Sequence, residues 1–150
     1  MAQLTKVMGY FDIADKEGLA CLTGGRRMDR KGLFVEPTVY GDTGNDCRVA
    51  QEEIFGPVIA LIRFTDEDEA VAIGNDIRYG LAAGIWTENV RRAHRIATRL
   101  KAGTVWVNNY RQVSYSVPFG GFKESGLGRE LGPEALYDYT EVKSVWIDAH

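Results

Sequence analysis

The stretch QEEIFGPVIALIRF, residues 51–64, joins an acid pair to an apolar run through a Gly-Pro turn. Gly56 admits backbone angles that other residues avoid, and Pro57 fixes its own φ, so the turn is stiff. The run from Val58 to Phe64 is almost continuously apolar and closes at Thr65. Such a run is typical of a strand buried on both faces, which predicts a layered domain.

The turn in this stretch also carries groups that suit a nucleotide. Glu53 offers two carboxylate oxygens, which accept hydrogen bonds from neighbouring hydroxyls such as a ribose diol. Phe55 offers a flat apolar face on which a heteroaromatic ring could rest. The octet of residues 51–58 is equally consistent with a solvated acid pair ahead of a buried strand, because short motifs also match by chance.

Helix and strand patterns alternate on both sides of this stretch. Apolar residues at helical spacing predict a helix from Leu4 to Ala14, and the basic segment of residues 26–32 reads as a surface loop. The other predicted elements are strands at 19–22, 33–35, 38–40, 81–86, 103–107 and 142–147, with a break at Pro37, and helices that start at 65 or 66, at 88 and at 133. Strands that alternate with helices predict an α/β domain with a largely parallel sheet.

Composition narrows the partners and the compartment. The 150 residues fit one compact domain, and 18 basic against 21 acidic side chains argue against nucleic-acid or membrane-surface binding. No apolar run is long enough to span a bilayer, and the N-terminal residues lack the pattern of a secretion signal. Cys21 and Cys47 lack paired spacing, so we expect no disulfide framework, no metal site and a cytoplasmic setting.

A second informative segment is PFGGFKESGLGRELG, residues 118–132. Its Gly-Leu-Gly resembles a dinucleotide fingerprint, but the next glycine comes one residue late and a polar loop precedes it. A tight loop anchored by Phe119 and Phe122 is the better interpretation. From composition alone, Glu130 would be an ordinary surface acid.

Five segments together point to one family. They are QEEIFGPV at 51–58, NDIRYGLAAGIWT at 75–87, AGTVWVNNY at 102–110, the segment at 118–132 and YTEVKSVWI at 139–147. In this order and spacing they resemble the C-terminal part of the NAD(P)-dependent aldehyde dehydrogenase superfamily, in particular its betaine aldehyde dehydrogenase-like group. The resemblance implies a three-layer α/β sandwich. Residues 1–138 would form part of the catalytic domain, and residues 139–150 an association strand and tail of a homo-oligomer.

The resemblance also implies roles at the cofactor and the substrate. Glu53 matches the acid that binds the nicotinamide ribose of NAD or NADP, and Phe55 matches the phenylalanine that packs near the nicotinamide ring. Phe119 matches an aromatic wall of the aldehyde tunnel. Val113 stands where many relatives carry another tunnel aromatic, which implies a wider or less aromatic pocket here.

Two further features follow from the same resemblance. Glu130 matches an acid that some relatives use in a proton relay from the catalytic centre. The loop at residues 123–126 lies where some relatives bind a monovalent cation between subunits through backbone carbonyls.

The family reaction needs a cysteine thiolate, an oxyanion site and a carboxylate base, and in the family these lie upstream of the segments matched here. The Rossmann domain lies upstream as well. We expect Cys21 and Cys47 to be buried small hydrophobes, His94 to be exposed, and His150 to be only the terminal residue. The chain alone is therefore predicted to be an inactive, truncated aldehyde dehydrogenase. The alternatives are one half of a split enzyme, whose cofactor domain is encoded separately, and a non-catalytic interaction module.

Overall fold

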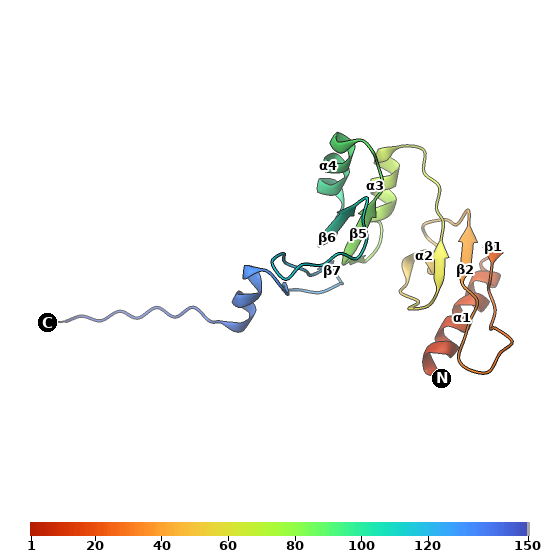
Figure 1. The fold of residues 1–150 in the computed structure, drawn as a ribbon, viewed down its shortest axis with the longest axis horizontal. Coiled ribbons are helices and arrows are strands. Elements are labelled where there is room, and N and C mark those ends of the chain that lie inside the picture. Colours follow the sequence, from red (N-terminus) through yellow and green to blue (C-terminus); the bar gives the residue numbers. More distant parts are fainter. Residues whose placement is uncertain (150) are drawn as a thin grey trace. The chain divides into compact units, whose positions relative to one another are not determined.

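The computed structural model describes residues 1–149 and groups them into two compact units. The first unit is Met1–Asp76, and the second begins at Ile77 (Figure 1). Composition alone fits a single compact domain, whereas the chain divides into two compact units, so each unit is described by itself. Among the described residues, no helix is both long and apolar enough to cross a membrane.

The first unit packs one long helix against a three-stranded sheet. In chain order its elements are α1 (Ala2–Lys16), β1 (Ala20–Thr23), β2 (Thr38–Gly41), α2 (Arg48–Gln51), β3 (Val58–Ala60) and α3 (Glu67–Asn75). The sheet order is β1-β2-β3, with β1 antiparallel and β3 parallel to β2. Asp66 caps α3 by accepting hydrogen bonds from the backbone of Asp68 and Glu69, as the predicted helix start requires.

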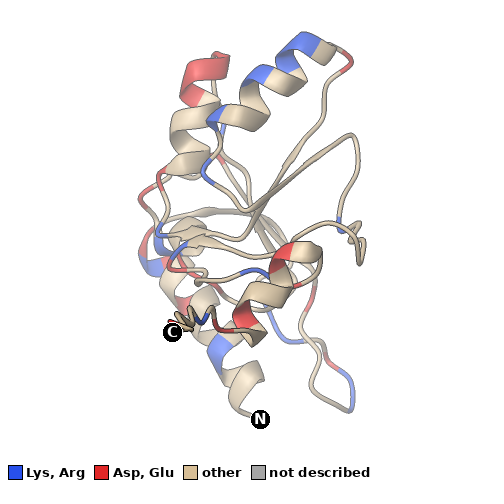
Figure 2. Ribbon diagram, turned by 90° about the vertical axis from the view of Figure 1, so that its left-hand side faces the viewer, with Lys and Arg blue, Asp and Glu red and all other residues tan. Residues whose placement is uncertain are grey.

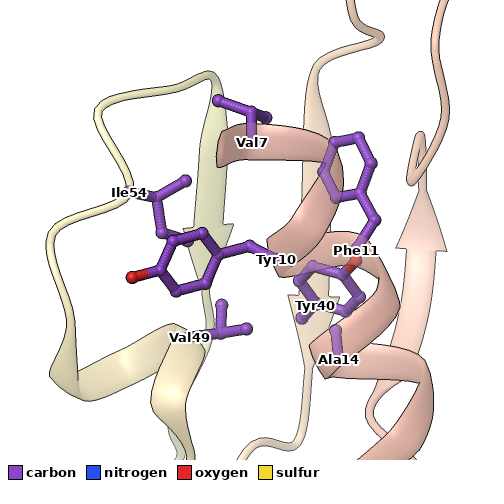
Figure 3. Packing of buried hydrophobic residues seen from close by; sticks show 7 residues of the cluster. All are labelled: Val7, Tyr10, Phe11, Ala14, Tyr40, Val49 and Ile54. Atoms are coloured by element: carbon purple, nitrogen blue, oxygen red, sulfur yellow. The ribbon is translucent and has the colours of Figure 1, made fainter. Parts of the chain in front are cut away.

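The core of the first unit lies between α1, β2, α2 and the turn after α2. Helical spacing places four buried side chains of α1 on one face, where they meet Tyr40 of β2 (Figure 3). The members of this cluster are Val7, Tyr10, Phe11, Ala14, Tyr40, Val49 and Ile54. Burial, and then the charges of Cys21 and Asp15, raise the pKa of Tyr40 to about 12.

The second unit contains a parallel strand–helix–strand motif and a smaller antiparallel pair. Its elements are β4 (Tyr79–Gly80), β5 (Ala82–Ile85), α4 (Val90–Arg99), β6 (Thr104–Val107), β7 (Phe122–Lys123) and the 3₁₀ helix η1 (Pro133–Tyr139). Strands β5 and β6 are parallel, and β4 and β7 are antiparallel. Asn89 caps α4 through the backbone N–H of Arg92, and basic residues recur along this helix (Figure 2).

The α/β class is confirmed, but the sheets are small and mixed. Two strand pairs are parallel and two are antiparallel, where the sequence predicted a largely parallel sheet. The reason lies in the connections. A helix crosses over between β5 and β6 and makes that pair parallel, whereas the loop after β1 returns the chain directly beside it as an antiparallel neighbour.

The predicted strand at residues 142–147 is wrong for the chain as it stands. No strand follows η1 among the described residues, and Val142, Trp146 and Ile147 are exposed. A strand needs a neighbour that pairs its backbone groups, and residues 142–147 have no such neighbour within residues 1–149. Two other predicted strands are shorter than expected. Residues 33–35 form only a bridge between Arg27 and Val35, and the strand at 58–64 narrows to β3.

Candidate functional site

The acid pair that opens the decisive stretch has two different environments. The Glu52 carboxylate accepts a hydrogen bond of 2.7 Å from the Tyr10 hydroxyl, and bonds of 2.8 and 3.0 Å from the guanidinium of Arg48. The Glu53 side chain is exposed and has no partner in the part of the chain that the structure describes. Glu52 is therefore a structural acid, and Glu53 is available to a ligand.

Helix α1 holds the turn that follows this pair. Lys6 Nζ donates to the Glu53 carbonyl at 2.7 Å, and Gln3 Nε2 donates to the carbonyls of Ile54 and Phe55 at 3.0 and 2.8 Å. The spacing of three residues places Gln3 and Lys6 on the same face of the helix. Three consecutive carbonyls of the turn are thus fixed by a helix that lies about fifty residues earlier in the chain.

Phe55 is presented to solvent in a strained conformation. Its φ is 54°, in the left-handed region that residues with a Cβ rarely adopt, and the side chain is 74% exposed. Lys6 Nζ lies 5.4 Å from the centre of the Phe55 ring. Behind it, Gly56 packs so closely on α1 that a Cβ there would lie 2.7 Å from Val7 Cγ2. The turn is therefore held with the ring outward and the backbone inward.

These features fit one end of a nicotinamide nucleotide. An unpaired carboxylate at Glu53 suits the two ribose hydroxyls, and an exposed ring at Phe55 suits the flat nicotinamide. Sequence reasoning predicted both residues but missed Gln3 and Lys6. A polar pair three residues apart on a helix is a common surface pattern, and nothing in the local sequence shows that it reaches a distant turn.

The second unit brings the two predicted tunnel residues together. Val113 and Phe119 line the same hollow of about 300 Å³. The other lining residues are Thr104, Val105, Trp106, Gln112, Ser114, Val117 and Pro118. Strand β6 thus forms one wall of the hollow, and the loop between β6 and β7 forms the other. Val113 itself is more than half exposed.

Glycines bring the loop close to β6. A Cβ at Gly103 would collide with the carbonyl oxygen of Gly120, so only glycine permits this approach of backbone to backbone. The predicted close packing of the glycine-rich segment is confirmed at this point. Phe119, which precedes Gly120, is thereby fixed beside the first residues of β6.

Glu130 lies directly opposite Phe119. The backbone N–H of Phe119 donates to the Glu130 carbonyl at 2.7 Å, and the N–H of Glu130 donates back at 2.8 Å. Residues paired in this way project their side chains to the same side of the ribbon. The exposed Glu130 carboxylate therefore shares a side with the Phe119 ring, a pairing that composition alone could not predict.

The loop at residues 123–126 is held by β4 and by Ile77, two residues before that strand. Lys123 has a φ of 53°, and its Nζ donates to the Ile77 carbonyl at 2.8 Å. The Ser125 hydroxyl accepts a 2.9 Å hydrogen bond from the backbone of Gly80. The Lys123 carbonyl accepts a long hydrogen bond of 3.5 Å from Gly126. Across residues 1–149, no three His, Cys, Asp or Glu side chains gather as metal ligands would.

Neither cysteine is placed as a nucleophile. Cys21 is exposed on β1, against the expectation of burial, because this face of the strand has no covering layer within the first unit. Cys47 is half-buried and packs against the first unit's core, as predicted. The two histidines are His94, which is exposed on α4 as expected, and His150, which lies outside the described residues. The first unit thus has no imidazole base beside either thiol.

Comparisons with known proteins agree with the geometry. The model of the aldehyde dehydrogenase family matches residues 1–145. An aldehyde dehydrogenase of Emericella nidulans is 52% identical over 143 residues, which cover 95% of this chain and 29% of that protein. A betaine aldehyde dehydrogenase of Brucella anthropi is 45% identical over 151 residues, which cover 98% of this chain and 31% of that protein. The chain thus spans about three tenths of the length of these relatives.

Solved structures give the same match. An aldehyde dehydrogenase from Bacillus cereus in complex with NAD+ superposes with a TM-score of 0.95 and 47% identity, over 100% of this chain and 30% of that one. A betaine aldehyde dehydrogenase from Staphylococcus aureus, also in complex with NAD+, superposes with a TM-score of 0.90 and 42% identity, over 93% of this chain and 28% of that one. The chain belongs to the aldehyde dehydrogenase family.

Proposed function

We propose that this chain supplies the nicotinamide contact and part of the aldehyde tunnel of an NAD(P)-dependent aldehyde dehydrogenase. The reaction converts an aldehyde, NAD(P)+ and water into a carboxylic acid and reduced cofactor. The observation that carries the proposal is the unequal acid pair, in which Glu52 is locked in the structure and Glu53 is left free. In the complete fold, both units would join a three-layer sandwich.

Each residue at the cofactor end has a separate task. Glu53 accepts hydrogen bonds from the nicotinamide ribose and so sets the depth of the ring. Phe55 packs near the ring and limits its rotation. Gln3 and Lys6 hold the turn in place, so that neither contact must be ordered when the cofactor binds. When bound, the nicotinamide accepts the hydride from the substrate.

The second unit supplies the substrate end. Phe119 and Val113 form apolar walls for the tail of the aldehyde, and the small Val113 leaves room for a bulky tail. Glu130, on the same side as Phe119, relays a proton away from the reacting centre to solvent.

The test of the cofactor contact uses nicotinamide mononucleotide, which carries the end that Glu53 and Phe55 would hold. Titration of the ¹⁵N-labelled chain at millimolar ligand should shift the amides of residues 53–56 more than any others. Glu53→Gln should weaken these shifts severalfold. Asp12→Asn removes an exposed charge from the outer face of α1 and serves as the matched control. Equal shifts in both variants would rule out the role of Glu53.

We further propose that the 150 residues alone do not oxidise aldehydes, because neither thiol has an imidazole base beside it within the first unit. The purified chain with NAD+ or NADP+ and a panel of aldehydes should give no reduced cofactor. Turnover by this chain alone would overturn the proposal. If the protein is half of a split enzyme, a separate polypeptide that carries the thiol and the cofactor domain should restore turnover on mixing.

A second candidate function is a non-catalytic association module. The exposed apolar residues after η1, among them Val142, Trp146 and Ile147, favour it because an unpaired segment can add to the sheet of another chain. Light scattering over a range of concentrations should show dimers or larger species. A strict monomer at high concentration would count heavily against self-association through residues 139–150.

A further inference from the structure

The loop that carries Val113 begins with a fixed reversal after β6. The Asn108 backbone donates to the Ile85 carbonyl at 2.8 Å, and its side chain makes two 2.8 Å hydrogen bonds to the backbone of Thr87. Asn108 and Arg111 both have positive φ, at 51° and 60°, which turns the chain back on itself. The start of the loop is thus tied to the end of β5.

Trp106 of β6 then binds the loop at the point where it runs back beside this strand. Its indole Nε1 donates to the Gln112 carbonyl at 2.8 Å, so the bond closes just before Val113. The Tyr110 ring stands edge-on to the indole, with centroids 5.4 Å apart and planes at 73°. The next contacts downstream are at Tyr115, whose carbonyl accepts from Gly132 at 2.9 Å, and at Ser114, whose carbonyl accepts from Val117.

Residues 112–114 line the hollow. Along the chain, the hydrogen bond from the Trp106 indole is therefore the first contact that holds this segment. Trp106 lines the hollow as well, so one side chain forms part of the β6 wall and also holds the opposite wall. The wall can move away from β6 only by breaking this bond, because Val113 contributes no polar side-chain group that could replace it. The width of the hollow at Val113 is thus set by the indole.

We infer that Trp106 is a positioning residue that fixes Val113 and thereby selects the apolar tails that the hollow admits. This inference rests on the proposed tunnel for its ligand, an aldehyde with an aromatic or branched tail. It extends the tunnel proposal to a residue that does not act on the reacting carbonyl. Trp86 is the natural comparison, because it also neighbours Tyr110, at 6.5 Å, but does not line the hollow.

The experiment measures amide solvent exchange and ligand binding in the full chain by NMR. Trp106→Phe keeps an aromatic ring and removes the donor, and Trp86→Phe is the matched control. The Val117 amide reports on the wall, and the Gly103 amide, bonded to the Gly80 carbonyl, reports on the fold of the unit. Benzyl alcohol serves as an unreactive probe of the hollow, followed at the amides of Val113 and Phe119.

Trp106→Phe should speed exchange at Val117 roughly three- to tenfold, as expected for one lost hydrogen bond, and leave Gly103 unchanged. The Kd for benzyl alcohol should rise by a similar factor. Trp86→Phe should change neither quantity by more than about twofold, which is below the effect of one hydrogen bond.

Unchanged exchange at Val117 would overturn the inference. Equal acceleration at Val117 and Gly103 would also overturn it, since Trp106 would then only support the fold. If the unmodified chain does not bind benzyl alcohol, the proposed tunnel fails, while the exchange rates still decide whether Trp106 positions the wall.

Discussion

The two units hold their functional segments by different means. In the first unit, side chains of α1 bind the carbonyls of the turn at residues 53–55, and a buried apolar cluster supports the helix. In the second unit, the loop that carries Phe119 is placed mainly by backbone against backbone, at Gly103 with Gly120 and at Phe119 with Glu130. A turn held by side-chain hydrogen bonds can lose one of them and keep its position. Two backbone segments in contact at a glycine cannot accommodate even a single added Cβ atom. The units should therefore respond differently to substitution.

We expect the largest loss of stability at Gly103, a position in the second unit where only glycine fits. Gly103→Ala places a Cβ against the Gly120 carbonyl, and neither backbone segment can move away cheaply. We expect a loss of about 3 kcal/mol in the free energy of unfolding. Tryptophan fluorescence during urea unfolding measures it, because all three tryptophans lie in the second unit. Gly9→Ala, at an open site in α1 of the first unit, is the control and should leave the unfolding transition seen by tryptophan fluorescence unchanged.

A smaller effect should distinguish the first unit by its response to alkali. Tyr40 has a pKa of about 12 in the folded chain, against about 10 unfolded, so folding favours its protonated form. Its contribution is fully present below pH 10 and is lost as the pH rises from 10 towards 12. Thermal melts followed by circular dichroism between pH 8 and about pH 11 should show this loss. Tyr40→Phe should reduce the alkaline loss, and an identical slope in both proteins would refute the assignment.

The acid pair gives a sharper contrast inside one turn. Glu52→Gln loses charged hydrogen bonds to Tyr10 and Arg48, so we expect a loss of about 1 kcal/mol in the free energy of unfolding. Glu53→Gln loses no bond within the chain and should change stability by less than about 0.5 kcal/mol. Urea unfolding followed by circular dichroism compares the two variants. Equal losses would mean that Glu53 is structural as well, and the cofactor proposal would lose its main support.

Local pattern was enough to predict α1, the Asp66 cap, β5 and α4, because spacing and capping residues act within a few positions. It failed where the described residues hold no partner for a segment, or where the partner lies far along the chain. Residues 142–147 have the composition of a strand but no neighbour to pair with, and β1 has no layer above Cys21. The roles of Glu53 and Phe119 came from family resemblance. The hydrogen-bond partners of their backbones, Lys6 and Glu130, depend on contacts that spacing does not encode.

The smallest predicted effect tests whether the hydrogen bonds from Gln3 to the turn stabilise only that turn and not the whole unit. Gln3→Ala frees the carbonyls of Ile54 and Phe55 but leaves the apolar face of α1 intact. Both carbonyls can turn to water, so the free energy of unfolding should fall by only about 0.5 kcal/mol. Solvent exchange at the Gly56 amide should nevertheless accelerate, since Phe55 can then relax from its positive φ. Exchange in β2 is the internal control. If the Gly56 amide of this variant exchanges at the rate of the unmodified chain, then Lys6 alone holds the turn and the hydrogen bonds of Gln3 are not needed.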